Sequence, residues 1–179
     1  PQMEKDEWQK FCEKISELGK YLEDEGMPLA YHHHMGTVIE TQKDTERLIE
    51  NTHESVKLTL DTGHMLFAKG DSKYILQNYH ERILHVHCKD IRKQVLEKSL
   101  KEDLSFRGAF LEGAFTVPGD GCIDYQPLFN VLKNNNYSGW LVVEAEQDPA
   151  KANPLEYAKI GYNYLTDTLK KSEIEIYKN

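Results

Sequence analysis

The sequence predicts an α/β fold in which parallel strands alternate with helices along the chain. Four short apolar runs are typical of strands, each is followed by a helical pattern, and their spacing suits parallel crossover connections. With 179 residues, the chain is shorter than the roughly 250 residues of a complete (β/α)8 TIM barrel. Two architectures therefore remain: a small doubly wound sheet, or the second half of a barrel that is entered through a helix.

An amphipathic helix opens the chain, because apolar residues recur at steps of three and four from Trp8 to Leu22 and the pattern stops at Gly26. A first strand is expected over Leu29–Thr37. The next segment begins at Thr41 and has the polar face of a surface helix. One helix, one strand and a second helix thus follow each other without a long loop.

The same alternation continues through the middle of the chain. A second strand is expected over Val56–Leu60 and ends at Asp61, and a helix follows after Gly70 and Asp71. A third strand is expected over Ile83–Cys88. Successive strands separated by helices favour parallel pairing.

The spacing changes after the third strand. Residues 91–124 hold two short amphipathic pieces and a turn-rich end, and we expect this segment to act as a lid, because long loops in compact domains are usually functional. A helix, a fourth strand over Gly139–Glu144 and a last helix from about Pro154 complete the chain.

Composition and charge restrict the classes of function. Lys and Arg number 22 against 30 Asp and Glu, a formal net charge of −8, and the basic residues are scattered, which argues against a nucleic-acid partner. No apolar run approaches the roughly 20 residues that span a bilayer, and the charged start of the chain lacks a signal-peptide core, so no membrane partner is expected. Three widely spaced cysteines without a CxxC pair fit the reducing cytoplasm.

Titratable side chains gather where the predicted strands end. They are His32, His33 and His34 on the first strand, Asp61 and His64 at the second, His85, His87 and Lys89 at the third, and Glu144 and Glu146 at the fourth. In a parallel barrel the carboxyl ends of the strands converge on one mouth, where active sites lie. Imidazoles and carboxylates together suit a divalent transition metal such as Mn, Co or Zn.

Each of these residues also has an ordinary structural interpretation. A single strand histidine is usually a core residue with a backbone hydrogen bond, and Asp61 is a candidate helix cap. Glu146 is a candidate solvated loop residue. It is the coincidence of so many titratable groups at strand ends that favours a functional site.

The ordered motifs resemble a known superfamily. DTGH at 61–64, HVHCKD at 85–90, a Gly-Asp-Gly turn before Ile-Asp, and GWLVVE at 139–144 are similar to the xylose-isomerase-like (sugar phosphate isomerase/epimerase) TIM barrels. AYHHHMGT, FTVPGDGCIDY and VVEAEQDP together are similar to one family within it, the inosose dehydratases. The resemblance implies that residues 1–179 are a single domain, the C-terminal half of the barrel, with a leading helix and the last four βα units. It also implies that the first barrel strands precede Pro1.

The resemblance implies one metal ligand from each of these last four strands. Asp61, His87 and Glu144 match three of the positions directly. Isomerases and epimerases of the superfamily usually have a glutamate at the first position, where this sequence has His32, and strand parity allows His34 as the alternative. Manganese or cobalt is the expected metal, with zinc as the other choice.

The absence of that glutamate favours a lyase. Elimination needs one base, whereas epimerisation commonly uses two carboxylates. The implied reaction is the dehydration of 2-keto-myo-inositol, a cyclic polyol ketone. Glu144 is the first candidate base and Glu146 the second, and His64 or His34 is the expected proton donor. The remaining site residues are expected to contact the substrate: Lys89, Arg92, His85 and His33.

Three alternatives remain open. A sugar isomerase or epimerase on the same barrel is the first, and a truncated half barrel that only binds a metal or a polyol is the second. A phosphodiesterase of the endonuclease type is disfavoured by the net charge. For Arg92, a surface ion pair is the competing interpretation. A homo-oligomer is compatible with each of these readings.

Overall fold

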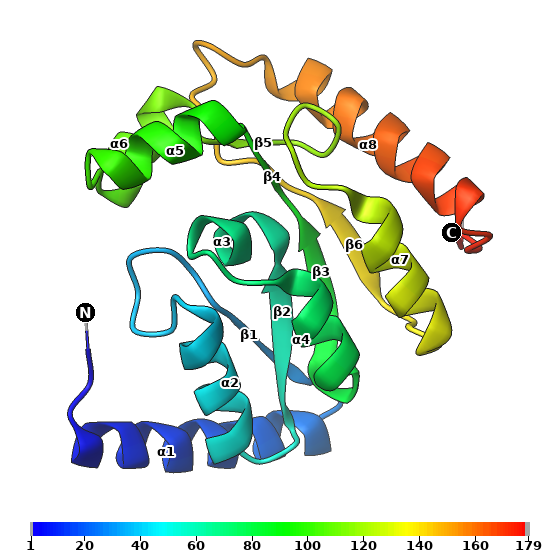
Figure 1. Cartoon of the computed structure of the whole chain (residues 1–179). Coiled ribbons are helices and arrows are strands. Elements are labelled where there is room, and N and C mark those ends of the chain that lie inside the picture. Colours follow the sequence, from blue (N-terminus) through cyan, green and yellow to red (C-terminus); the bar gives the residue numbers. More distant parts are fainter. Residues whose placement is uncertain (1, 178–179) are drawn as a thin grey trace.

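The computed structural model describes residues 2–177. Its centre is a parallel sheet in which neighbouring strands follow one another along the chain (Figure 1). The strands are β1 (Leu29–His32), β2 (Val56–Asp61), β3 (Ile83–Cys88) and β6 (Trp140–Val143), in the order β1-β2-β3-β6. A doubly wound sheet reverses its strand order at a switch point, and this sheet shows no reversal over the described residues. The sequential order is that of a (β/α) barrel.

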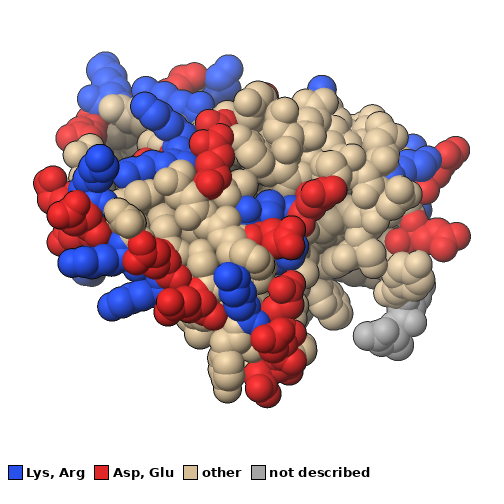
Figure 2. All heavy atoms as spheres, turned by 90° about the horizontal axis from the view of Figure 1, so that it is seen from below, with Lys and Arg blue, Asp and Glu red and all other residues tan. Residues whose placement is uncertain are grey.

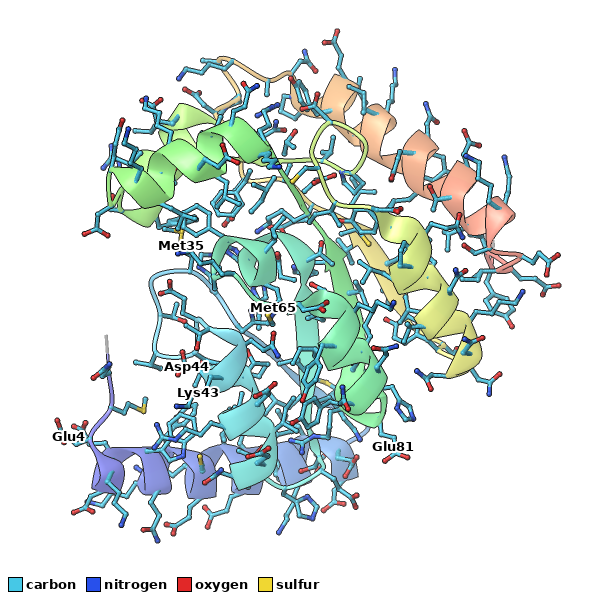
Figure 3. The ribbon with its side chains drawn as sticks, viewed as in Figure 1. Glu4, Met35, Lys43, Asp44, Met65 and Glu81 are labelled. Atoms are coloured by element: carbon cyan, nitrogen blue, oxygen red, sulfur yellow. The ribbon has the colours of Figure 1, made fainter. Side chains whose placement is uncertain are left out.

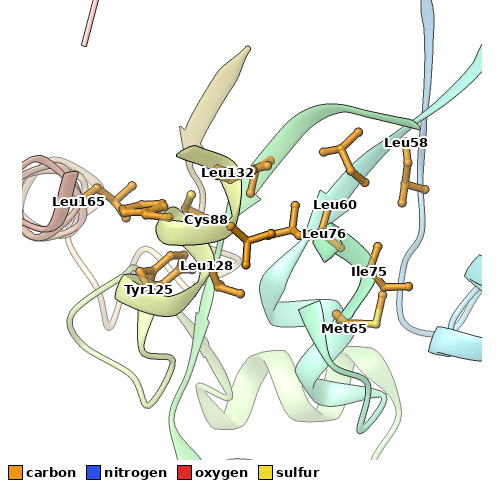
Figure 4. Close-up of a cluster of buried hydrophobic side chains, with 14 of the residues drawn as sticks. Leu58, Leu60, Met65, Ile75, Leu76, Cys88, Tyr125, Leu128, Leu132 and Leu165 are labelled. Atoms are coloured by element: carbon orange, nitrogen blue, oxygen red, sulfur yellow. The ribbon is translucent and has the colours of Figure 1, made fainter. Parts of the chain in front are cut away.

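Helices cover one face of this sheet. They are α2 (Gln42–Asn51), α4 (Ser72–Asn78), α7 (Tyr125–Asn134) and α8 (Pro154–Lys171). The buried cluster that joins them to the sheet includes Leu58 and Leu60 of β2 and Val86 and Cys88 of β3 (Figure 4). Each fully buried leucine contributes about 1.5 to 3 kcal/mol of hydrophobic free energy. This cluster is the main core.

Helix α1 (Lys5–Asp24) lies below the sheet in Figure 1, across the start of β1 and β2. Gly19 allows this close approach, because a Cβ there would lie 2.9 Å from the hydroxyl oxygen of Ser55. Trp8 and Cys12 of the same helix are buried against Leu48 of α2. The expected amphipathic helix is confirmed.

Strand alternation directs polar side chains to the opposite face of the sheet. Because Leu58, Leu60, Val86 and Cys88 face the helices, the residues that alternate with them along the two strands face the other way. These residues are Thr59 and Asp61 on β2 and His85 and His87 on β3. Trp140, at the start of β6, is 64 % exposed. Parallel sheets are normally covered on both faces. Here the four covering helices pack on the opposite face, which leaves this second face to carry functional side chains.

The first strand is shorter than the sequence predicts. It ends at His32, so His33 and His34 lie in the segment that follows, where strand parity does not fix their direction. A helix that the sequence analysis did not predict, α3 (Thr62–Phe67), begins directly after Asp61. Both differences lie at the carboxyl edge of the sheet.

Residues 91–124 contain the two expected amphipathic pieces as α5 (Lys93–Lys101) and α6 (Phe106–Glu112). A short antiparallel pair, β4 (Asp90–Ile91) and β5 (Phe115–Thr116), closes the segment at its base. A second apolar cluster holds it against the rest of the molecule. That cluster includes Met35, which Figure 3 shows beneath the α5–α6 pair. The lid role of the segment stays a prediction.

Within residues 2–177, none of the helices combines the length and the apolar character that crossing a membrane requires. Figure 2 views the molecule from below the view of Figure 1, and Lys and Arg are interspersed there with Asp and Glu. A one-sided basic stripe, which nucleic-acid binding uses, is not formed on that face.

Candidate active site

The strand ends bring four predicted metal ligands together. His32 Nε2 lies 3.3 Å from Asp61 Oδ2, and His87 Nδ1 lies 3.6 Å from the same oxygen. Glu144 follows β6 directly, and its Oε2 lies 3.6 Å from His87 Nδ1. We call these four residues the first donor group.

Asp61 is held in place by the helix that follows it. Its Oδ1 accepts a hydrogen bond of 2.8 Å from the backbone N–H of His64 and so caps α3, which leaves Oδ2 free to face His32 and His87. The side chain is fully buried. Burial would raise the pKa of Asp61, but the facing imidazoles of His32 and His87 and the ammonium of Lys89 lower it well below the usual range. Asp61 is both a helix cap and a site carboxylate.

The donor atoms of His32, Asp61 and His87 in the first group are spaced as a single metal ion requires, all within 4.8 Å of one another. Ligands 2.0–2.2 Å from a tetrahedral ion lie about 3.4 Å from one another, close to the observed separations of 3.3 to 3.6 Å. His87 Nδ1 and Glu144 Oε2 are also buried without a hydrogen-bond partner. Glu144 Oε2 does lie 2.8 Å from Lys89 Nζ, but outside hydrogen-bond geometry. A divalent ion fits the two imidazoles and the carboxylate of Asp61, and the carboxylate of Glu144 lies next to His87.

A second set of donors lies beside the first. Glu146 Oε1 lies 3.2 Å from His34 Nε2, and Glu146 Oε2 lies 3.2 Å from His64 Nε2. The two imidazole rings are 3.7 Å apart between centroids. We call His34, His64 and Glu146 the second donor group. Burial would raise the pKa of Glu146, but both imidazoles and Lys89 lower it well below the usual range.

Lys89 connects the two groups. Its Nζ lies 2.8 Å from Glu144 Oε2, 2.8 Å from Glu146 Oε2 and 3.2 Å from Asp61 Oδ2, and the side chain is fully buried. Although burial alone would lower the pKa of Lys89, the three carboxylates raise it. Lys89 is therefore a buried ammonium shared by three carboxylates.

The backbone of Lys89 is fixed by two neighbouring hydroxyl groups. Thr62 Oγ1 accepts a bond of 3.2 Å from the N–H of Lys89 and lies 2.7 Å from its carbonyl oxygen. The hydroxyl of Tyr125 also donates to that carbonyl, at 3.0 Å. These contacts tie the end of β2 to the end of β3, so the first two residues of the DTGH motif serve both the site and the sheet.

Two aromatic rings that the sequence analysis did not single out border the second donor group. The centroid of Phe106, on α6, lies 4.9 Å from that of His34, and the centroid of Phe115 lies 5.1 Å from that of His64. Phe106 belongs to one of the amphipathic pieces, whose pattern predicted only a helix. No signal in the sequence marked its contact with a histidine 72 positions earlier.

His33 does not lie where a substrate could reach it. Its side chain is fully buried, and Nε2 accepts a bond of 3.1 Å from the backbone N–H of Asp61. Burial lowers the pKa of His33 to about 3, so the ring is neutral. The expectation of a substrate contact is corrected to a supporting role behind Asp61.

Arg92 is likewise engaged elsewhere. Its Nη2 lies 2.6 Å from Asp120 Oδ2 and 3.1 Å from Thr116 Oγ1, and its Nη1 donates to the carbonyl of Gly113. It lines a separate hollow with Gln147 and Tyr157. Instead of the expected substrate contact, Arg92 makes the ion pair that was its alternative, and it braces the turn at 119–121. His85 shares a sheet face with His87, one step further from the strand ends.

The sequence profile of the family described as xylose isomerase-like TIM barrel matches residues 1–168. An inosose dehydratase of Clostridium beijerinckii is 50% identical over 163 residues, which cover 90% of this chain and 55% of that protein. The rhizopine catabolism protein MocC of Rhizobium meliloti is 46% identical over 165 residues, 92% of this chain and 51% of that protein. The chain thus spans about half the length of these relatives.

Solved structures share the fold at lower identity. The probable 3-DHS dehydratase AsbF of Bacillus anthracis superposes with a TM-score of 0.71 at 18% identity, over 92% of this chain and 58% of that one. An L-ribulose 3-epimerase superposes with a TM-score of 0.68 at 16% identity, over 97% of this chain and 57% of that one. With a family profile that covers residues 1–168 and a sequential parallel sheet, the chain belongs to the xylose isomerase-like TIM barrel family.

Proposed function

We propose that this chain forms the metal-binding part of a dehydratase that removes water from 2-keto-myo-inositol, a cyclic polyol ketone. The observation that carries the proposal is the convergence of His32, Asp61 and His87 at the strand ends, with donor spacings that suit one ion. Glu144 lies beside His87. Relatives that are 45% to 50% identical over nine tenths of the chain are named inosose dehydratase, which supports the substrate.

The first donor group would hold a divalent metal ion, with manganese or cobalt as the proposed metal and zinc as the alternative. Two imidazoles and two carboxylates are a donor set for such an ion. When bound, the metal supplies a Lewis acid that polarises the ketone and stabilises negative charge on its oxygen. The remaining steps fall to side chains of this chain.

Glu144 is the proposed base. It stands at the end of β6 with a partly exposed carboxylate, where it can take the proton from the carbon next to the ketone. Glu146 is the second choice, but its carboxylate already faces His34, His64 and Lys89. The ammonium of Lys89 lies beside Glu144 and would favour negative charge that develops on the substrate.

The second donor group would complete the elimination. As the bond to the β-hydroxyl breaks, that oxygen takes a proton from His64 or His34 and leaves as water. The electron pair from the broken C–H bond becomes the new carbon–carbon double bond, and the resulting enol tautomerises to a diketone. Phe106 and Phe115 border these imidazoles on one side and would exclude solvent from the proton transfer.

We further propose that four additional βα units complete the barrel around this sheet, which makes the chain its C-terminal half. The exposed Trp140 and the partly exposed imidazole of His87 lie on a face that no helix of the described residues covers. The chain also spans only 55% of the length of the Clostridium beijerinckii relative. Units of that kind would close the sheet and add the remainder of the substrate pocket.

A complementation experiment tests this function. The chain is co-expressed with the part of the Clostridium beijerinckii relative that it does not match, and the complex is supplied with Mn²⁺ and 2-keto-myo-inositol. We expect a diketone that absorbs in the near ultraviolet, and no product from the Glu144→Gln chain in the same complex. A folded complex that binds Mn²⁺ but leaves the substrate unchanged would contradict the proposed function.

A further inference from the structure

The loop that follows β6 carries two carboxylates of the candidate site. Glu144 and Glu146 both face Lys89, and one oxygen of each lies 2.8 Å from its Nζ. Within residues 2–177, the last backbone hydrogen bond that joins this loop to β3 runs from the N–H of Glu144 to the carbonyl of Cys88, at 3.4 Å. Beyond that bond, the loop depends on side-chain contacts for its position.

The other side of the loop has a contact of its own. Val143, Ala145 and Gln147 alternate with the two carboxylates and line a small hollow beside α8. From this side, Gln147 Nε2 donates a hydrogen bond of 3.2 Å to Thr116 Oγ1. The residue directly after Glu146 is thus tied to β5, at the returning end of the α5–α6 segment.

The hydroxyl of Thr116 is fully buried and uses all of its hydrogen-bonding capacity. Oγ1 donates to Asp120 Oδ2 at 2.6 Å. Its two lone pairs accept from Gln147 Nε2 at 3.2 Å and from Arg92 Nη2 at 3.1 Å. Because the single proton is engaged with Asp120, Gln147 presents its amide nitrogen and not its oxygen. The contact between Thr116 and Gln147 therefore has one defined geometry.

The backbone of Thr116 is tied to the same part of the site. Thr116 pairs with Asp90 in the β4–β5 ladder, and β4 begins directly after Lys89. These contacts form a closed ring. Lys89 meets Glu146 from the site side, and the strand after Lys89 holds, through Thr116, the residue after Glu146. The loop is gripped from both sides.

We propose that Thr116 is a positioning residue for the carboxylates of the reaction, because through Gln147 it holds the loop from which Glu144 and Glu146 reach the site. The inference rests on the proposed function, in which Glu144 is the base. Thr116 acts through another side chain. A loosened loop would misplace the base and so lower kcat more than it weakens substrate binding.

The first test is the rate of tryptic cleavage after Lys151, an exposed residue of the same loop, in the 179-residue chain. Cleavage requires local opening, and we expect it to be about 3- to 10-fold faster in Thr116→Val and in Gln147→Met, which both lose the bond. Thr116→Ser keeps the hydroxyl and should be cleaved at the wild-type rate. Gln147→Met leaves the bond to Asp120 intact, and serves if Thr116→Val does not fold. Cleavage after Lys69, in the exposed turn after α3, is the internal reference and should not change.

The second test is steady-state kinetics of the complemented enzyme. We expect kcat to fall about 10- to 100-fold in Thr116→Val and in Gln147→Met, with KM within about twofold of the wild type, and Thr116→Ser to restore kcat. Lys151→Met is the matched control. It removes the other contact of this loop with the α5–α6 segment, a bond of 2.7 Å from Lys151 Nζ to the carbonyl of Leu111, and should keep the wild-type kcat.

Two outcomes would overturn the inference. One is a folded Thr116→Val or Gln147→Met chain that is cleaved after Lys151 at the wild-type rate, because the bond would then not hold the loop. The other is an active complex in which these variants lower kcat no more than Lys151→Met does. A wild-type complex that forms no diketone contradicts the proposed function instead, while the cleavage rates still decide whether Thr116 holds the loop.

Discussion

The side chain of Lys89 passes so close to the backbone of Gly63 that a Cβ at position 63 would lie 2.7 Å from Lys89 Cγ. Gly63 is the third residue of the DTGH motif, and it stands in a helix, where alanine is normally preferred. The close approach of Lys89 explains why a glycine stands at position 63, since no unusual backbone conformation there requires one. It also links the end of β2 to the cation of the site.

We expect Gly63→Ala to destabilise the protein by about 1 to 3 kcal/mol, because the added methyl group overpacks the stem of a buried lysine. Urea unfolding measures the change. Gly108→Ala is the matched control, since its Cβ would meet its nearest neighbour at 3.4 Å, an ordinary contact. That variant should gain up to about 1 kcal/mol from helix propensity. A Gly63→Ala protein as stable as Gly108→Ala would show that Lys89 does not pack as described.

Asp61→Asn tests the first donor group without removing the helix cap, because asparagine caps helices as well as aspartate does. We expect the Mn²⁺ affinity to fall by more than about 100-fold, the upper range for loss of an outer partner of a metal ligand. Asp71→Asn makes the same change at the exposed cap of α4, and should leave the affinity unchanged. Equal Mn²⁺ affinities for the two variants would remove Asp61 from the ligand set.

The buried His33 predicts a dependence of stability on pH in metal-free protein. Its pKa is about 3 in the folded state and about 6.5 in an unfolded chain, so between these values the unfolded state binds an extra proton. Stability therefore falls as the pH falls, by about 2 kcal/mol from pH 6.5 to pH 5. His87 has a raised pKa of about 9, and its contribution is constant below pH 6.5.

His33→Gln isolates that dependence, because a glutamine oxygen can accept the same bond from the N–H of Asp61. Urea unfolding of both proteins across pH 5 to 6.5 gives the difference in slope. We expect the wild type to lose stability more steeply than the variant. Parallel slopes would mean that His33 is protonated in the folded protein.

Phe106 should affect turnover and not metal binding. Phe106→Ala opens the side of the second donor group where the ring faces His34, so water would reach the proton-transfer groups. In the complemented enzyme we expect kcat/KM to fall about 10- to 100-fold with unchanged Mn²⁺ affinity, from steady-state kinetics and metal titration. Phe110→Ala, one turn along the same helix beside a separate hollow, is the control. Equal losses in both variants would contradict a specific role for Phe106.

The strands were predictable because hydrophobic periodicity is strong where a sheet is buried. The third strand has the predicted bounds, Ile83–Cys88, and its alternation placed His87 correctly on the polar face. The rule failed where the strand stopped early, since His33 and His34 lie beyond the end of β1. The sequence did not predict α3, β4 or β5. Helix α3 has only six residues and the two strands have two each, which is too short to show a hydrophobic periodicity.

The donor groups were predictable as a set of residues but not as a geometry. Convergence of parallel strand ends brought His32, Asp61 and His87 together, as expected. The pairing of His34 with Glu146 depends on two loops, and the placement of Lys89 between three carboxylates depends on the space above Gly63. Such contacts arise from tertiary packing, which leaves no local signal in the sequence.

Product analysis in deuterated water tests the central claim most directly. The complemented enzyme is incubated with Mn²⁺ and 2-keto-myo-inositol, and the products are identified by mass spectrometry and near-ultraviolet absorbance. With Glu144 as the base and His64 or His34 as the proton donor, we predict a diketone that has lost one water and no epimer at any time. A ketose that keeps its oxygen atoms and carries deuterium next to the carbonyl, without loss of water, would contradict the account and identify an epimerase.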